Sequence, residues 1–399
     1  MTHRERMLAT IRGEPTDRIP WAPRMDLWYI ANRARGTLPE GFDGLNTVEI
    51  AEVLDVACHN NGGDFTRTGN RDLSLRGFGL ANHPDYPYRV ELRGLPVDFE
   101  DDGENQRTLI QTPAGPVFIH LHRDSQMSRD GISIPFVKSY AIDSADDFEA
   151  IAQVFEHLEI VPTPEAYAAF RQRVGKRGIA VARGLVAASP MHLMLHELVA
   201  MDQFFYLYAD EREAMHRLAE RMAPFFEAAL DALVACDAEV VFWGANYDQD
   251  LTWPPFFKAE IAPWLKKVSD RLHAAGKQLL THTDGENQAL FPLYRACGFD
   301  VAESVCPHPM TKCTLAEIRA AFGPDVTVWG GIPSVALLDD AMDDATFEAY
   351  LDELFDSLGA GDHLILGVAD NVPPDANLDR LERIKARVEA FGPVRPPSG

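Results

Sequence analysis

The sequence predicts an α/β protein in which eight parallel strands form a (β/α)8 barrel, also called a TIM barrel. Short apolar runs typical of buried strands alternate with longer amphipathic segments along the 399 residues. Helical crossovers are the connection that parallel pairing requires, and eight strands are the number that closes such a barrel. We therefore expect one domain spanning residues 1–399, with an open doubly wound sheet as the alternative.

The N-terminus predicts a helix that precedes the first strand. Thr2 and Glu5 have the spacing of a capping box, in which each side chain bonds the backbone N–H of the other residue. Gly13, followed by Pro15, is expected to end this helix after about three turns.

Eight mostly apolar runs follow, and we interpret them as the barrel strands. They are Ile19–Pro23, Leu54–His59, Gly178–Arg183, Glu239–Trp243, Gln278–His282, Asp300–Ser304, Val326–Trp329 and His363–Gly367. Amphipathic helices are expected between the later strands, at 259–275, 290–297 and 315–322. Active sites of such barrels lie at the carboxyl ends of the strands, so the residues after these runs are the candidates for function.

A segment from about 85 to about 140 breaks the alternation and predicts an inserted antiparallel β-meander between the second and third barrel strands. Its strand-like runs lie at 88–92, 108–112 and 117–122. An acidic loop at 100–104 and a turn at 113–116, which contains two prolines and a glycine, are expected to join them.

Composition argues against several functions. The chain carries 37 Lys and Arg against 61 Asp and Glu, a formal charge of −24 that repels nucleic acids and anionic lipids. The most apolar stretch, 179–201, is interrupted by charged residues and a proline, so no membrane span is expected. The N-terminus lacks the apolar run of a signal peptide, and the five cysteines show no paired spacing. We therefore expect a cytoplasmic protein with a small-molecule substrate.

The most informative motif is His282-Thr-Asp284-Gly, at the end of the fifth expected strand. Residues two apart share one face of a strand, so the imidazole and the carboxylate lie together. Asn287–Phe291 is expected to open a helix, and the next strand delivers Glu303, with Cys306 close behind. Such groups on adjacent strand ends indicate acid/base or metal chemistry. A hydrogen-bonded pair that caps the following helix is the structural alternative for His282 and Asp284.

Other polar and aromatic residues follow the expected strands and are candidates for substrate binding. They are Arg24, Asp26, Trp28, Arg183, Asn246, Tyr247 and Asp248. The two guanidinium groups match carboxylates in bidentate geometry, so they suit an anionic substrate or ion pairs at the barrel rim. His192 and His196 have helical spacing and are interpreted as an ordinary helix face, while His120 and His122 belong to the meander.

Several segments resemble proteins of the uroporphyrinogen decarboxylase superfamily. They are the opening 4–20, the His282-Thr-Asp-Gly285 strand end, Trp329-Gly-Gly-Ile-Pro333 and the segment 367–375. The resemblance covers nearly the whole chain and independently implies a (β/α)8 barrel. The true porphyrinogen decarboxylases carry an Arg-Gln-Ala-Gly-Arg motif after the first strand. Here that place matches only at Arg24, so decarboxylation in the haem pathway is not expected.

A second branch of the superfamily contains zinc methyltransferases, which pass methyl groups between corrinoid proteins and thiols. Their signature is His-x-Cys on strand five, in some members a Glu on strand six, and a Cys on strand eight. This chain is similar at His282 and Glu303, but it has Asp284 and Asp370 where the cysteines belong. Carboxylates make a harder metal site, better suited to oxygen ligands than to a thiol.

The resemblance therefore implies a metal-assisted methyltransferase that demethylates a small, O-methyl substrate to or from a corrinoid protein. Zinc or another divalent metal would be held by His282, Asp284, Glu303 and Asp370, with Cys306 a weaker candidate. The corrinoid would belong to a separate partner protein, because this chain has no room for its own cobalamin domain. A homodimer is expected by family analogy alone.

Two alternatives stay open at this point. A metal-free decarboxylase would use Arg24, Arg183 and Asp26 to bind a carboxylated substrate and deliver a proton. A non-catalytic binding barrel is the third reading, which the many polar strand ends disfavour.

Overall fold

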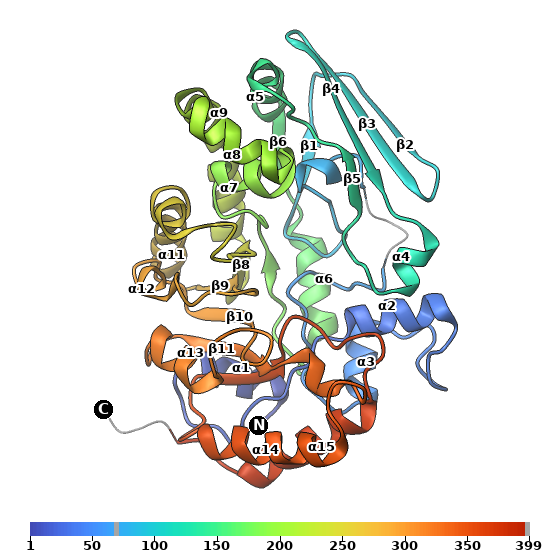
Figure 1. Ribbon diagram of the computed structural model, residues 1–399, viewed down its shortest axis with the longest axis vertical. Helices are drawn as coiled ribbons and strands as arrows, with labels where there is room; N and C mark the ends of the chain where they lie inside the picture. Colours follow the sequence, from blue (N-terminus) through green and yellow to red (C-terminus); the bar gives the residue numbers. More distant parts are fainter. Residues whose placement is uncertain (68–71, 396–399) are drawn as a thin grey trace.

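A parallel sheet of six strands forms the centre of the molecule in the computed structural model, which describes residues 1–67 and 72–395 (Figure 1). Its strands, in the order β12-β11-β10-β9-β8-β7, are all parallel to their neighbours. They are β7 (Ala182–Arg183), β8 (Val240–Ala245), β9 (Gln278–His282), β10 (Val301–Val305), β11 (Thr327–Ile332) and β12 (Leu364–Val368). The predicted α/β fold with a parallel sheet is confirmed, and these strands match the last six of the eight expected runs.

The first two expected strands pair with their neighbours only through isolated contacts. Trp21 bridges Leu366 of β12, and Cys58 bridges Gly178, shortly before β7. Between the two segments, the Ala57 N–H donates to the Trp21 carbonyl at 2.9 Å. Backbone bonds thus lead from β12 through both segments towards β7. Two prolines in the first segment lack an N–H, which limits its pairing to single contacts.

An apolar cluster lines the inner side of this curved arrangement. It takes residues from all eight expected segments and from the N-terminal helix α1 (His3–Ile11). The members are Met7, Leu8, Ile11, Ala22, Ala57, Ile179, Val181, Val240, Phe242, Ala245, Leu280, Val301, Trp329 and Ile365. Since strand side chains alternate between two faces, the residue two positions beyond such a member points to the same interior.

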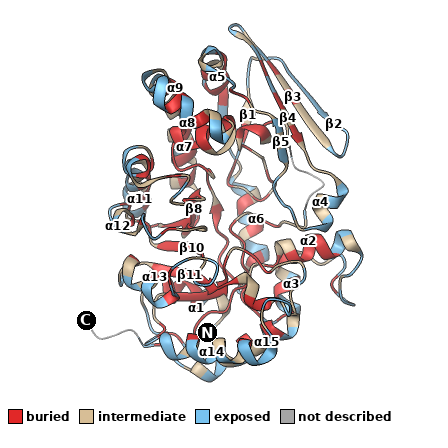
Figure 2. Ribbon diagram, viewed as in Figure 1, coloured by how far each residue is buried: buried red, intermediate tan, exposed pale blue. Residues whose placement is uncertain are grey.

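Helices surround the central and the inserted sheets, with their buried sides turned towards the interior (Figure 2). They include α2 (Asp26–Arg35), α3 (Thr47–Val53), α5 (Phe148–Glu156), α6 (Pro164–Val174), α7 (Pro190–Leu193), α8 (Met201–Asp210), α9 (Arg212–Ala235), α10 (Pro254–Phe256), α11 (Ala262–Ala274), α12 (Phe291–Tyr294), α13 (Leu315–Phe322), α14 (Asp344–Ser357) and α15 (Leu378–Phe391). In α1, Thr2 and Glu5 form both bonds of the capping box. Across the described residues, no helix has the length and apolar character to span a membrane.

The helix expected to open at Asn287 starts later, at Phe291, and this prediction was wrong. The Asn287 side-chain amide donates to the carbonyls of Thr283, Asp284 and Gly285 at 3.0, 3.0 and 2.9 Å. These bonds satisfy the backbone locally and hold the segment after β9 as a loop.

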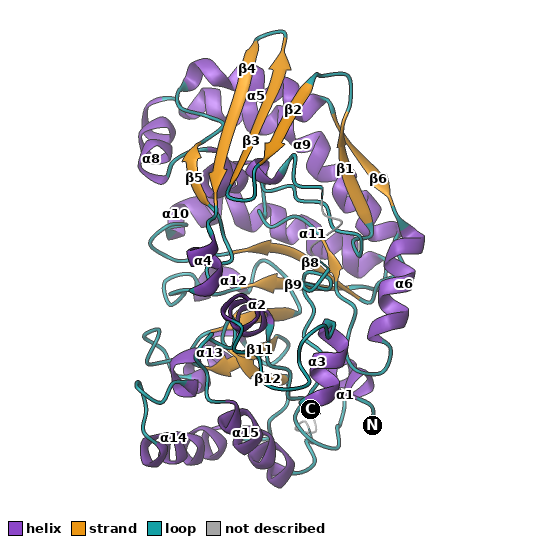
Figure 3. Ribbon diagram, turned by 90° about the vertical axis from the view of Figure 1, so that its right-hand side faces the viewer, coloured by secondary structure: helices purple, strands orange, loops and turns teal. Residues whose placement is uncertain are grey.

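The inserted β-structure differs in one respect from the predicted meander. Its antiparallel sheet has four strands, β2 (Val97–Asp101), β3 (Asn105–Thr112), β4 (Gly115–His122) and β5 (Phe136–Ser139), followed in Figure 1 at the end of the molecule opposite α14 and in side view in Figure 3. The expected first strand, β1 (Tyr88–Leu92), pairs instead with β6 (Leu158–Pro162). Strand β2 was missed because it is exposed along its whole length and carries three acidic residues among its five, so that its end was taken for the acidic loop.

Candidate functional site

Five polar side chains lie above the apolar cluster, at the carboxyl ends of the strand segments. They are Arg24, His59, Arg183, His282 and Glu303, and each stands two positions beyond a cluster member. Strand alternation directs all five into the same interior. In the pairing of β9, β10 and β11, Glu303 is in register with both His282 and Trp329.

Glu303 is the centre of this group, and its side chain is fully buried. Its Oε2 atom lies 2.5 Å from His282 Nδ1. Its Oε1 atom lies 2.9 Å from His59 Nε2, at ion-pair distance but without the alignment of a hydrogen bond. The His59 ring stacks on Trp329, with centroids 4.5 Å apart. A buried carboxylate therefore holds two imidazoles in place.

The charges of this group support one another. Burial alone would lower the pKa of His282, but Glu303 and Asp284 outweigh it and raise this pKa to about 10. Burial would conversely raise the pKa of Glu303, while His282 and His59 hold it well below its usual value. In the absence of other ligands, His282 and Glu303 are thus an imidazolium–carboxylate pair near neutral pH.

The second ring nitrogen of His282 faces two further carboxylates. Its Nε2 atom lies 3.6 Å from Asp284 Oδ2 and 3.6 Å from Asp370 Oδ1. Arg24 bonds Asp370 at 2.8 Å and Asp26 at 2.8 Å, so both of its ends are paired. Burial would raise the pKa of Asp370, but Arg24 and His282 keep it lowered.

The backbone is strained at two strand ends beside these groups. Asn246, after β8, has φ 61°, and Ser304, within β10, has φ 66°. Register shifts occur in both places, between β8 and β9 and between β10 and β11. At the second, Gly330 has φ 140°, and a Cβ there would lie 2.6 Å from the Val305 carbonyl oxygen. Bulges and strained residues of this kind collect at functional sites.

His196 also reaches this region, although the sequence pattern had placed it on an ordinary helix face. It lies in a single π-helical turn, Met194–Leu198, that continues from α7. Its Nδ1 lies 2.7 Å from Glu197 Oε1 and its Nε2 2.6 Å from the Asn246 amide. Burial opposes protonation, but Glu197 raises the pKa of His196, and the charges of Asp284 and His282 also act on it. His196 thus lies in a π-turn instead of on a regular α-helix, and π-turns often mark functional sites.

Residues 124–391 match the family model "Uroporphyrinogen decarboxylase (URO-D)". This chain belongs to the uroporphyrinogen decarboxylase family. The resemblance carried by the strand-end motifs is thereby confirmed. Among solved structures, a methyltransferase from Methanosarcina mazei has a similar fold, with a TM-score of 0.53 and 14% identity over 98% of this chain and 99% of that chain. A search of curated proteins finds no match.

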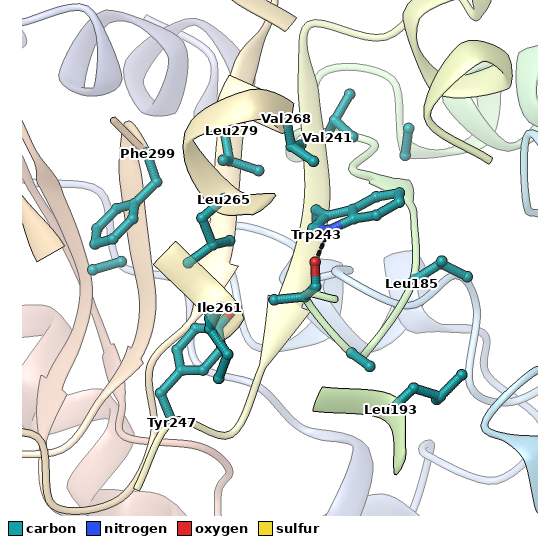
Figure 4. Close-up of a cluster of buried hydrophobic side chains, with 14 of the residues drawn as sticks. Leu185, Leu193, Val241, Trp243, Tyr247, Ile261, Leu265, Val268, Leu279 and Phe299 are labelled. Atoms are coloured by element: carbon teal, nitrogen blue, oxygen red, sulfur yellow. Dashed lines mark hydrogen bonds between the residues drawn. The ribbon is translucent and has the colours of Figure 1, made fainter. Parts of the chain in front are cut away.

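Not every residue expected in the site of this family member reaches it. Tyr247 is fully buried against Ile261 and Leu265 on the outer side of the sheet (Figure 4), with its hydroxyl 2.9 Å from Thr281 Oγ1. Trp28 packs edge-on against Phe42 in the core. Both side chains are therefore left out of the site proposed below.

Asp248 and Cys306 also have local roles. Asp248 accepts the N–H groups of Asp250 and Glu286 at 2.8 and 3.0 Å, which fixes two loops. Burial raises the pKa of the Cys306 thiol to about 12, and all five cysteines are free.

The expected metal ligands are only partly brought together. Among the described residues, no three His, Cys, Asp or Glu side chains are arranged to hold a metal ion as they stand. Glu303 faces the two imidazoles rather than an open position. The set with the right chemistry is His282 Nε2 with Asp284 and Asp370, one nitrogen and two hard oxygen donors that face one another across 3.6 Å.

Arg183 differs from Arg24 in its surroundings. Its guanidinium lies 3.8 Å from the centroid of the Phe242 ring, and one N–H donates to the Asn61 carbonyl at 3.2 Å. Burial lowers the pKa of Arg183, and Tyr86 and the nearby charge of Glu303 offset this only in part. Within the described part of the chain, no carboxylate forms an ion pair with it.

Proposed function

We propose that this chain is an enzyme that transfers a methyl group from a small O-methylated substrate to a corrinoid on a separate protein. The family membership supports an enzyme, and the similar fold of a methyltransferase over nearly the whole chain is consistent with this branch. The observation that carries the proposal is the orientation of His282, which lies between the buried Glu303 carboxylate and the partly exposed carboxylates of Asp284 and Asp370.

This orientation is that of a metal-ligating histidine. Histidines that bind metals typically give their other ring nitrogen to a carboxylate, which fixes the tautomer and aims the free lone pair. Glu303 supplies that bond to Nδ1, and Nε2 is left facing Asp284 and Asp370. We therefore assign Glu303 an orienting role instead of the ligand role expected from the sequence.

A divalent metal such as zinc would be held by His282, Asp284 and Asp370. When bound, it would act as a Lewis acid on the ether oxygen of the substrate. The chain itself prepares the donors: Arg24 fixes the Asp370 carboxylate at 2.8 Å, and Ser304 Oγ lies 3.4 Å from the same oxygen. The buried Glu303 excludes water from the inner side of the imidazole.

We further infer that the site stands at the mouth of a closed eight-stranded barrel. The contacts of Trp21 with Leu366, of Ala57 with Trp21 and of Cys58 with Gly178 supply the three links that the six-stranded sheet lacks. The apolar cluster taken from all eight segments fits a filled barrel interior.

Decarboxylation is the alternative, and the geometry favours it less. It depends on Arg24 to bind the substrate carboxylate, whereas this guanidinium is already paired with Asp26 and Asp370. Freeing it would break two charge-assisted hydrogen bonds.

The test combines metal content with turnover. The wild type and the variants His282→Ala, Asp370→Asn and His216→Ala are reconstituted with excess zinc and measured by elemental mass spectrometry. We expect near-stoichiometric metal in the wild type and in His216→Ala, whose half-exposed histidine is a matched control. Metal should be lost in His282→Ala and reduced in Asp370→Asn.

The same proteins are then mixed with a reduced corrinoid protein and O-methyl donors, and methylation of the corrinoid is followed by absorbance. A folded wild type that binds no metal and methylates no corrinoid would contradict the proposal. Release of CO2 from a carboxylated substrate, abolished by Arg24→Ala and retained by His282→Ala, would replace it with the decarboxylase.

A further inference from the structure

Arg183 is a partly buried cation for which the described residues supply no counter-ion. Among the described residues its nitrogens make one hydrogen bond, 3.2 Å to the Asn61 carbonyl, although a guanidinium has five N–H donors. The plane of the group is fixed by the Phe242 ring, 3.8 Å from its carbon atom. The side chain is therefore held in one orientation with most of its donors free.

Other buried arginines of this chain are paired. Arg24 bonds Asp26 and Asp370, Arg6 bonds Asp17 at 2.6 Å, and the fully buried Arg380 lies 3.0 Å from Asp339. This contrast matters because a buried charge without a partner is costly, and proteins seldom keep one that has no use. Neutralisation of Arg183 by an incoming anion would remove that cost.

Neighbouring acids are committed elsewhere. Glu303 acts on Arg183 only through its field, since its two oxygens lie against His282 and His59. Asp26 and Asp370 are held by Arg24. The group that completes Arg183 is therefore expected from outside the chain, and a carboxylate matches the guanidinium fork in shape and charge.

We propose that the substrate is an O-methylated carboxylic acid whose carboxylate binds Arg183. This inference rests on the proposed methyl transfer at His282. Arg183 ends β7 and His282 ends β9, two strands apart, so the anchor and the reacting group are separated by about 10 Å along the sheet. A ring with its acid and methoxy groups on opposite sides suits that separation, and Phe242 orients the anchor.

The test uses a matched pair of probes, 4-methoxybenzoate and 4-methoxybenzamide, which differ in the carboxylate. Their binding to the wild type, Arg183→Gln, Arg183→Lys and Arg217→Gln is measured by titration calorimetry. The wild type is expected to bind the acid at least tenfold more tightly than the amide. Arg183→Gln should lose this preference and Arg183→Lys should keep part of it, while Arg217→Gln, changed at an exposed arginine on α9, should match the wild type.

Circular dichroism of each variant confirms that the fold is kept, and Arg183→Lys retains the charge if Arg183→Gln unfolds. The inference is overturned if the wild type binds neither probe, binds the amide as tightly as the acid, or keeps its preference in Arg183→Gln. Corrinoid methylation without a carboxylate preference would overturn this inference and leave the proposed function intact. A carboxylate preference without corrinoid methylation would support the binding of a carboxylate by Arg183 and contradict the proposed methyl transfer.

Discussion

Glu303 is the residue on which the geometry of the site depends. Its charge compensates His282 in a fully buried position. We expect Glu303→Ala to lower the free energy of unfolding by about 3–5 kcal/mol, the usual loss when one partner of a buried pair is removed. Urea unfolding at pH 7 measures this. Glu303→Gln, which keeps the shape and a hydrogen-bonding oxygen, should lose less; equal losses in both variants would show that packing, not charge, is what matters.

His59 is the second imidazole beside Glu303. Both of its ring nitrogens are buried without a hydrogen bond, while the ring stacks on Trp329. His59→Phe keeps the aromatic contact with Trp329 but leaves the buried Glu303 Oε1 atom without its ion-pair partner, so the free energy of unfolding should fall by about 1–3 kcal/mol. If His59 positions Glu303, methyl transfer should also fall at least about tenfold. A stable variant with full activity would show that His59 has no part in the reaction.

The candidate site was predictable at its strand ends and not beyond them. His282, Asp284, Glu303, Arg24 and Asp370 follow recognisable strands, so strand direction alone places them together. His59 and His196 were missed for different reasons. His59 ends a segment that pairs with its neighbours only through isolated contacts. Its position two residues after the apolar Ala57 is the pattern that could have indicated an inward-facing side chain. His196 depends on a π-helical turn, which the spacing of residues does not reveal.

At the scale of elements, the end of β8 depends on the absence of a side chain at Gly244. Gly244 has φ 78°, and a Cβ there would overlap the hydroxyl of Tyr247, which bonds Thr281. Gly244→Ala is expected to cost about 2–6 kcal/mol, from backbone strain and overpacking. Tyr247→Phe should relieve part of this loss, with a coupling of about 0.5–3 kcal/mol in a double-mutant cycle. If the losses of the two single variants simply add in the double variant, the Tyr247 hydroxyl does not contact position 244.

Helix α1 is attached by an ion pair that depends on pH. The Arg6 guanidinium and the terminal amine of Met1 hold the pKa of Asp17 far below its ordinary value. Two Arg6 nitrogens donate to the Asp17 carboxylate, at 2.6 and 2.8 Å. A lowered pKa stabilises the fold above the ordinary value of 3.8, and this stabilisation is lost as pH falls below it. Asp17→Asn should therefore be less stable than the wild type at pH 7. In urea unfolding the difference should shrink as pH approaches 2; a constant difference would contradict this.

Elements with a buried face were the ones that the sequence revealed. The six strands of the parallel sheet are almost wholly buried, so their apolar runs stand out. Strand β2 is exposed throughout and was read in part as a loop. The expected helix at Asn287 failed because one side-chain amide captures three carbonyls, a competition that apolar periodicity does not record.

At the scale of the whole molecule, the site joins segments that are far apart along the chain. Arg24 and Asp370 are 346 positions apart and form a 2.8 Å hydrogen bond. This contact exists only if the first expected strand lies beside β12, which places the two ends of the chain at one seam. The same closeness would not arise in an open sheet with the first segment at a distant edge. The arrangement of Arg24 and Asp370 in the site therefore depends on the pairing of the first segment with β12.

Hydrogen exchange tests the closure of the barrel directly. The N–H groups of Ala22, Leu366, Ala57 and Cys58 bond at 2.9 Å across three junctions: between β12 and the first segment, between the first and second segments, and between the second segment and residue 177. In a closed barrel, they open only with the sheet as a whole, so their protection should approach that of β8 and β11 amides. In an open sheet they would form frayed edges and exchange orders of magnitude faster. Native-state exchange read by NMR distinguishes the two. Fast exchange at Ala22 and Leu366 alone would leave the Arg24–Asp370 contact without its backbone support, and Arg24→Ala would then be expected to leave the site largely unchanged.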